Sequence, residues 1–167
     1  MDLRVFYSDL GAVMDWGKGQ RRCAIGPAGI GAKTHEGDGV TPRGSFALRR
    51  IFYRPDRLAP PKAMLAVKPI AENDGWCDAP ADPRYNGLVR LPYPASAELL
   101  WRADHVYDLI AVVGFNDDPV VAGKGSAIFL HLARPDFAPT AGCVALEQQD
   151  LLEALAQFQP GDRVRIG

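Results

Sequence analysis

The chain has 167 residues, of which 47% are hydrophobic and 23% are charged. This is the length of one domain and the composition of a globular protein, so the sequence excludes an intrinsically disordered chain. Nineteen Lys and Arg against twenty Asp and Glu leave a net charge of −1, and non-specific nucleic-acid or anionic-membrane binding has no electrostatic basis here. We therefore expect a single domain over residues 1–167 with no nucleic-acid partner.

The sequence contains no stretch that predicts a membrane span or a secretory leader. The first residues include Asp2 and no apolar run of the roughly 7–15 residues that a signal peptide carries. No later segment reaches the roughly 18 consecutive apolar residues of a membrane helix. We expect neither feature in the sequence as it stands.

Glycine and proline are unusually frequent, with 17 and 14 copies among 167 residues. Their share lies above the roughly 12% that the pair averages in proteins. Residues 26–44 contain six glycines and two prolines, which predicts a loop, and residues 69–87 form a second turn-rich excursion. A long loop inside a small domain is often a binding loop or a lid. This composition favours a turn-rich β protein over a helical bundle.

Short apolar and β-branched runs predict strands along the whole chain. In chain order, the expected strands are residues 3–7, 22–25, 45–53, 64–67, 107–113, 127–132 and 163–166. Residues 95–102 are expected to form a short helix.

The best predicted helix covers residues 147–158. Leu151, Leu155 and Phe158 recur on one helical face, and Pro160 follows as a stop signal. Many strands with one main C-terminal helix predict a mostly-β domain of the all-β or α+β class, built as a sandwich or a barrel.

The residues most suited to chemistry are Cys143 and His131. Cys143 follows a Pro/Thr/Gly turn in which Gly142 allows close approach to the backbone, and successive amides of such a turn can form an oxyanion site. His131 lies at the end of an expected core strand. A cysteine nucleophile needs a base or a lowered pKa, and a nearby histidine supplies either. A buried structural cysteine and an unrelated histidine are the competing interpretation.

The other cysteines carry less information. Cys23 lies in an expected strand and is interpreted as core packing, although a bridge between Cys23 and Cys77 is conceivable. The scattered Cys and His residues show no CxxC or HxxxH spacing, so we expect no zinc site.

Three segments resemble the YkuD-type L,D-transpeptidase catalytic domain. Residues 125–131 (GSAIFLH) end in His131, and residues 140–144 (TAGCV) hold Cys143, in the order of that family's signature. Upstream, residues 39–46 (GVTPRGSF) resemble the family's Thr-Pro-x-Gly-x-Phe turn.

The resemblance implies an L,D-transpeptidase-like β fold that acts on peptidoglycan stem peptides outside the cytoplasm. It implies that Cys143 is the nucleophile, that His131 is the general base, and that the backbone carbonyl of Leu132 orients the imidazole ring. The amides of Ala141, Gly142 and Cys143 would hold the oxyanion. This chemistry requires no metal and no organic cofactor.

Two further residues are candidates for substrate contacts. Thr140 lies in the same turn as the cysteine. Arg43 follows the turn proline Pro42 and has the geometry to hold a carboxylate through two hydrogen bonds, although a solvated loop arginine is an equal alternative.

The sequence also departs from the family pattern. Ala141 stands where the family has His, Ala145 stands where Asn or Arg is usual, and His131 precedes Cys143 by only 12 positions. Three functions therefore remain open: an L,D-transpeptidase, a hydrolase on the same scaffold (an L,D-carboxypeptidase or amidase), and a non-catalytic peptidoglycan-binding module. The two alanines favour the third function, and the retained Cys143 and His131 argue against it.

Overall fold

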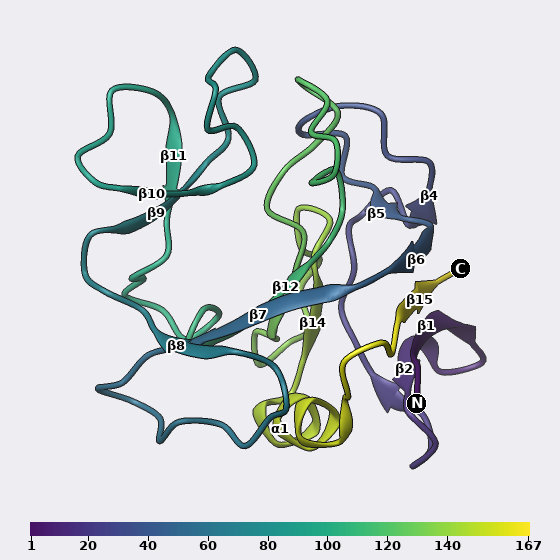
Figure 1. The fold of residues 1–167 in the computed structure, drawn as a ribbon. Helices are drawn as coiled ribbons and strands as arrows, with labels where there is room; N and C mark the ends of the chain where they lie inside the picture. Colours follow the sequence, from purple (N-terminus) through teal and green to yellow (C-terminus); the bar gives the residue numbers. More distant parts are fainter.

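The structure is a computed structural model that describes all 167 residues. Three open β-sheets, a two-stranded ladder and one helix make up the molecule, which confirms the mostly-β class (Figure 1). No sheet closes on itself, so the barrel alternative does not apply.

The first sheet brings the two ends of the chain together. β1 pairs in parallel with β15, with Leu3 opposite Val164. In spatial order the sheet contains β3 (Arg21–Arg22), β2 (Gly11–Asp15), β1 (Leu3–Ser8), β15 (Val164–Ile166) and β6 (Gly44–Phe46).

The second sheet is the most deeply buried part of the molecule. In spatial order it contains β14 (Val144–Leu146), β13 (Phe129–Leu132), β12 (Leu109–Val113), β7 (Leu48–Tyr53) and β8 (Val67–Pro69). Every residue of β12, β13 and β14 is buried. Both faces of these strands are covered, which is why their sequences are continuously apolar rather than alternating.

The third sheet is small and stands at one side of the molecule, at the upper left of Figure 1. It consists of β10 (Leu88–Arg90), β9 (Asp74–Cys77) and β11 (Ala97–Leu99), with β9 in the middle. A separate ladder joins β4 (Ile30–Gly31) to β5 (Thr41–Pro42) within the glycine-rich loop.

Helix α1 (Gln148–Gln157) matches the predicted helix to within one residue at each end. Its buried residues Leu151, Ala154 and Leu155 pack into a core of 24 buried residues that draws on the first and second sheets. None of the structure's helices has the length and apolarity that a bilayer-spanning segment requires.

A second core of ten buried residues fills the other face of the second sheet. Residues alternate between the two cores along β13: Leu130 and Leu132 join the larger core, whereas Phe129 joins the smaller one. Cys143 belongs to the smaller core, so the candidate nucleophile lies where the second and third sheets meet.

Several predicted elements differ from the structure. The expected helix at residues 95–102 is wrong, because its centre forms β11 and pairs with β9. The excursion at residues 69–87 contains β9 and is therefore not structureless. The expected strand 45–53 divides into β6 and β7, and the one at 64–67 lies instead at Val67–Pro69. The conceivable bridge between Cys23 and Cys77 does not form, since all three cysteines are free thiols.

Candidate active site

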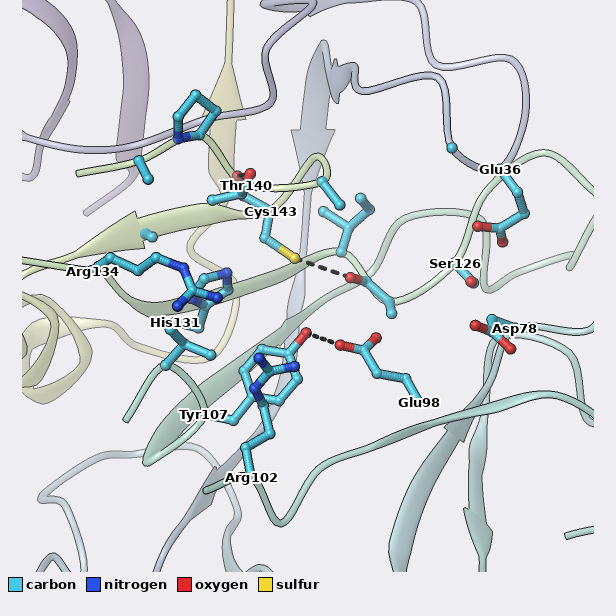
Figure 2. A pocket seen from close by; sticks show the side chains of 18 of the residues that line it. Glu36, Asp78, Glu98, Arg102, Tyr107, Ser126, His131, Arg134, Thr140 and Cys143 are labelled. Carbon is cyan, nitrogen blue, oxygen red and sulfur yellow. Dashed lines mark hydrogen bonds between the residues drawn. The ribbon is translucent and has the colours of Figure 1, made fainter. Parts of the chain in front are cut away.

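A cleft of about 420 Å³ opens at the edge of the second sheet, and both Cys143 and His131 line it (Figure 2). Its walls come from the glycine-rich loop, the third sheet, the segment before β12 and the loop between β13 and β14. The charged and hydroxyl side chains that line it are Lys33, Glu36, Asp78, Glu98, Arg102, Tyr107, Ser126, Arg134 and Thr140.

The register of two strands places Cys143 and His131 on one face of the sheet. β13 and β14 are parallel, with His131 opposite Ala145. Cβ atoms alternate between the two faces along a strand, so Cys143, two residues before Ala145, points to the same side as His131. The sequence places these residues 12 positions apart, and the parallel pairing brings them into one cleft.

The thiol of Cys143 is buried and hydrogen-bonded at rest. It donates to the carbonyl oxygen of Ala127 at 3.1 Å and accepts from the amide of Phe129 at 3.4 Å. In Figure 2 the bond to Ala127 leads away from the His131 ring. Burial raises the pKa of Cys143 to about 12, although the Phe129 amide and the positive charge of Lys33 act to lower it. The resting cysteine is therefore a neutral thiol at physiological pH.

His131 is also neutral at rest, and its tautomer is determined by one contact. Its Nδ1 lies 2.9 Å from the backbone oxygen of Leu132. A carbonyl only accepts, so Nδ1 carries the proton and Nε2 keeps the free lone pair. Burial lowers the pKa of His131 to about 4, with the charges of Arg102 and Arg134 adding to the effect and the Leu132 bond opposing it. Tyr107 packs edge-on against the imidazole, with the ring centres 5.3 Å apart.

The turn before Cys143 is held by the hydroxyl of Thr140. This hydroxyl accepts from the amide of Gly142 at 3.1 Å and donates to the carbonyl of Cys143 at 2.7 Å. The amides of Ala141 and Cys143 have no partner within the protein. Of the three amides expected to form an oxyanion site, these two are free to donate to a substrate, whereas that of Gly142 is occupied.

The comparisons with known proteins agree with this geometry. A family model for the YkuD L,D-transpeptidase catalytic domain matches residues 3–166, almost the whole chain. The chain belongs to this family. Comparison with curated proteins and with solved structures gave no match. Membership confirms the resemblance seen in the motifs and supports an L,D-transpeptidase-type enzyme with a peptidoglycan-related substrate.

Charged side chains divide the cleft of this L,D-transpeptidase domain into two ends. Arg134 lies beside His131, Arg102 lies against the Tyr107 ring, and both arginines make ion pairs with Asp104. Glu98 lies on the opposite side of Tyr107, whose hydroxyl donates to it. Burial raises the pKa of Glu98, and the Tyr107 bond acts against that rise.

The acidic end of the cleft includes two further carboxylates, Glu36 and Asp78 (Figure 2). Glu36 accepts a hydrogen bond from the hydroxyl of Tyr85. The Oδ1 atom of Asp78 is buried and has no hydrogen-bond partner. The sequence did not single out these residues, because they lie far apart in the chain and only the fold brings them together.

The remaining predicted site residues are distributed as follows. Leu132 lies in the core and contributes its carbonyl to His131, as the resemblance implied. Arg43 is exposed, lies against Gly167 at the C-terminus and does not line the cleft. Arg102 and Arg134 are the arginines that do.

Histidines outside the cleft have the roles expected of surface residues. His35 is an exposed loop residue beside Thr34, and His105 pairs with Asp108 at the surface. No group of three or more His, Cys, Asp or Glu side chains is arranged to hold a metal ion.

Asn86 connects the third sheet to the cleft, although the sequence predicts only that it lies in a turn-rich segment. The side-chain amide of Asn86 donates to the carbonyls of Phe115 and Asn116, and its oxygen accepts from Trp76 and Ala127. The carbonyl of Ala127 in turn accepts the hydrogen bond of the Cys143 thiol. Asn86 therefore holds the residue whose carbonyl accepts the hydrogen bond of the resting thiol.

Proposed function

We propose that this protein is a cysteine-dependent L,D-transpeptidase that forms a Cys143 thioester with a peptidoglycan stem peptide and transfers it to an amine. The observation that supports this most is the placement of a thiol, a neutral imidazole and two unpartnered amides around one cleft. These are the nucleophile, the base and the oxyanion donors that acyl transfer requires.

Acylation begins when the thiol leaves its hydrogen bond to Ala127 and turns its proton toward His131. Nε2 of His131 takes that proton while the sulfur attacks the carbonyl carbon of the L-centre residue that precedes the terminal D-Ala. The carbonyl oxygen becomes an oxyanion that accepts hydrogen bonds from the amides of Ala141 and Cys143. The C–N bond then breaks, the D-Ala amine takes the proton from His131, and a thioester remains.

The second half of the reaction reverses these roles. An acceptor amine attacks the thioester carbonyl, and His131 removes a proton from the amine nitrogen. Collapse of the second tetrahedral intermediate breaks the C–S bond, and the released sulfur recovers its proton from His131. The product is a new amide bond, and the enzyme returns to its neutral resting state.

The charged side chains of the cleft suit a substrate that carries both a negative and a positive charge. Arg102 and Arg134 offer guanidinium donors to a carboxylate. Glu36, Asp78 and Glu98 offer acceptors to an ammonium at the acidic end of the cleft. Stem peptides carry both groups, whereas the net charge of −1 on the protein offers no attraction to a polyanion.

Intact mass after incubation with a carbapenem tests the nucleophile, because the β-lactam carbonyl acylates a reactive thiol. We expect one covalent adduct on the wild type and none on Cys143→Ala. An unmodified wild-type protein in a sample shown to be folded would contradict a catalytic thiol and would favour the peptidoglycan-binding module.

Product analysis with a tetrapeptide donor separates transfer from hydrolysis, since water attacks the same thioester when no amine is present. Addition of an amine acceptor is expected to produce a cross-linked product at the expense of the tripeptide. If tripeptide is the only product at every acceptor concentration, the protein is an L,D-carboxypeptidase instead.

A further inference from the structure

The glycine-rich loop places a buried lysine beside the nucleophile. The side chain of Lys33 is only 2% exposed, and its Nζ lies 2.6 Å from Oδ1 of Asp38. Lys33 lines the same cleft as Cys143. A Cβ atom built on Gly142 would lie 3.6 Å from this Nζ, so the ammonium lies against the turn that carries the oxyanion amides.

Asp38 holds the side chain of this lysine in place. Its carboxylate accepts from the amides of Thr34 and Val40 at 2.9 and 3.0 Å, as well as from Lys33. Burial acts to raise the pKa of Asp38, but these hydrogen bonds outweigh it and hold that pKa well below its usual range. A preformed carboxylate offsets the cost of burying the ammonium, which alone would be several kcal/mol.

The ammonium of Lys33 has N–H groups that are free to donate to a group bound in the cleft. An ammonium has three N–H groups, and Asp38 is the sole hydrogen-bond partner of Lys33. The remaining two have no acceptor in the protein. The turn before Cys143 contributes no positive charge of its own, and the imidazole of His131 is neutral. The charge of Lys33 acts to lower the pKa of Cys143, whereas the charge of Glu98 acts to raise it.

We propose that Lys33 is the electrostatic partner of Cys143, positioned by Asp38 to stabilise the negative charge of the thiolate and of the oxyanion. The inference rests on the proposed function in that it takes Cys143 as the nucleophile. In this role Lys33 supplies the positive charge that a neutral thiol–imidazole pair lacks at rest. The competing explanation is structural: Lys33 neutralises Asp38 and does nothing to the thiol.

The rate at which iodoacetamide alkylates Cys143 at pH 8 distinguishes the two explanations. A nearby opposite charge lowers a pKa by about 1–3 units, and we take the lower bound because Lys33 is paired with Asp38. A higher thiol pKa reduces the thiolate fraction but makes the thiolate more nucleophilic, so Lys33→Met should react about three- to tenfold more slowly. Peptide mapping assigns the label to Cys143.

The double variant Lys33→Met/Asp38→Asn is the decisive comparison, because it removes both charges and leaves no unpaired buried carboxylate. We expect it to react more slowly than both the wild type and Asp38→Asn. The exposed Lys18→Met serves as the control and should react as the wild type does. Thermal unfolding of each variant shows that the samples compared are folded.

Recovery of the wild-type rate in the double variant would overturn the proposal, since Lys33 would then serve only Asp38. A wild-type rate in folded Lys33→Met would overturn it as well. Alkylation needs no peptide substrate, so this result is independent of the acyl-transfer assay. Slow alkylation of the variants in a protein that transfers no peptide would refute the proposed function and leave the role of Lys33 standing.

Discussion

Replacement of Gly142 by alanine tests whether the turn before Cys143 requires glycine. Gly142 has a φ of +133°, and an added Cβ would lie 2.8 Å from the backbone oxygen of Val40. That oxygen has little freedom to move, because its peptide group is held by the amide of Thr41, which donates to the carbonyl of Gly29 at 2.9 Å. Gly17 provides the control: its φ is +87°, and an added Cβ would meet nothing within 4 Å.

The two substitutions share the cost of backbone strain but differ in steric contact. A non-glycine residue in a sparsely populated backbone region costs about 1–3 kcal/mol. A contact that forces backbone to shift in a packed region adds about 1–3 kcal/mol. Gly142→Ala should therefore lose about 1–3 kcal/mol more than Gly17→Ala in the free energy of unfolding.

Urea unfolding followed by fluorescence measures this difference, and carbapenem acylation reports on the turn itself. Gly142→Ala should also acylate more slowly, because the turn must shift and take the Cys143 amide with it. Gly17→Ala should acylate at the wild-type rate. Equal stabilities for the two variants would refute the reasoning, since the Val40 contact would then cost nothing.

Three other predictions follow from contacts around the thiol. The pKa of His131 falls from 6.5 to about 4 on folding, so between these two pH values the unfolded chain binds a proton that the folded chain does not. The free energy of unfolding should therefore drop by on the order of 3 kcal/mol as the pH falls from 6.5 to 4. In the same urea titration, a His131→Gln variant should lose less stability over this pH range. Asn86→Ala leaves up to four hydrogen-bonding groups unpaired and should cost about 2–4 kcal/mol, measured by thermal unfolding. Glu98→Gln removes a negative charge that raises the pKa of Cys143, so alkylation should become about two- to fivefold faster; an unchanged rate would mean that Glu98 is protonated already.

The elements that the sequence predicts well are those determined by local pattern. The apolar runs at residues 107–113 and 127–132 contain the buried strands β12 and β13. The spacing of Leu151, Leu155 and Phe158 predicts α1. The motifs also identify the family, because Cys143 and His131 are chemically distinctive and lie in the expected order.

The misread element at residues 95–102 shows where local preference loses to tertiary pairing. Its sequence, ASAELLWR, consists mainly of good helix formers. Ala97–Leu99 nevertheless forms β11, because β9 needs a second partner on its free edge. The paired residues lie 20 to 24 positions apart in the chain, so no local window contains the information.

The charged lining of the cleft was inaccessible to sequence analysis for a similar reason. Lys33 and Asp38 occur in a polar, glycine-rich loop, where a lysine is ordinarily solvated. The burial of Lys33 depends on Gly125, where an added Cβ would lie 2.6 Å from Cε of the lysine, and the ammonium then lies against the turn at Gly142. Only the packing of three distant segments reveals a buried charge beside the cysteine.

The two alanines that depart from the family pattern can now be weighed against catalysis. Ala141 is exposed at the cleft and Ala145 lies opposite His131, so both line the space that a substrate would occupy. The proposed nucleophile, the proposed base and the free amides are all provided by other atoms: the Cys143 sulfur, the His131 ring and the backbone of the turn. Small side chains at these two positions therefore leave the chemistry in place and widen the cleft around it. We infer that they bear on which stem peptide enters rather than on whether a thioester forms, and carbapenem acylation of the wild type decides between the two.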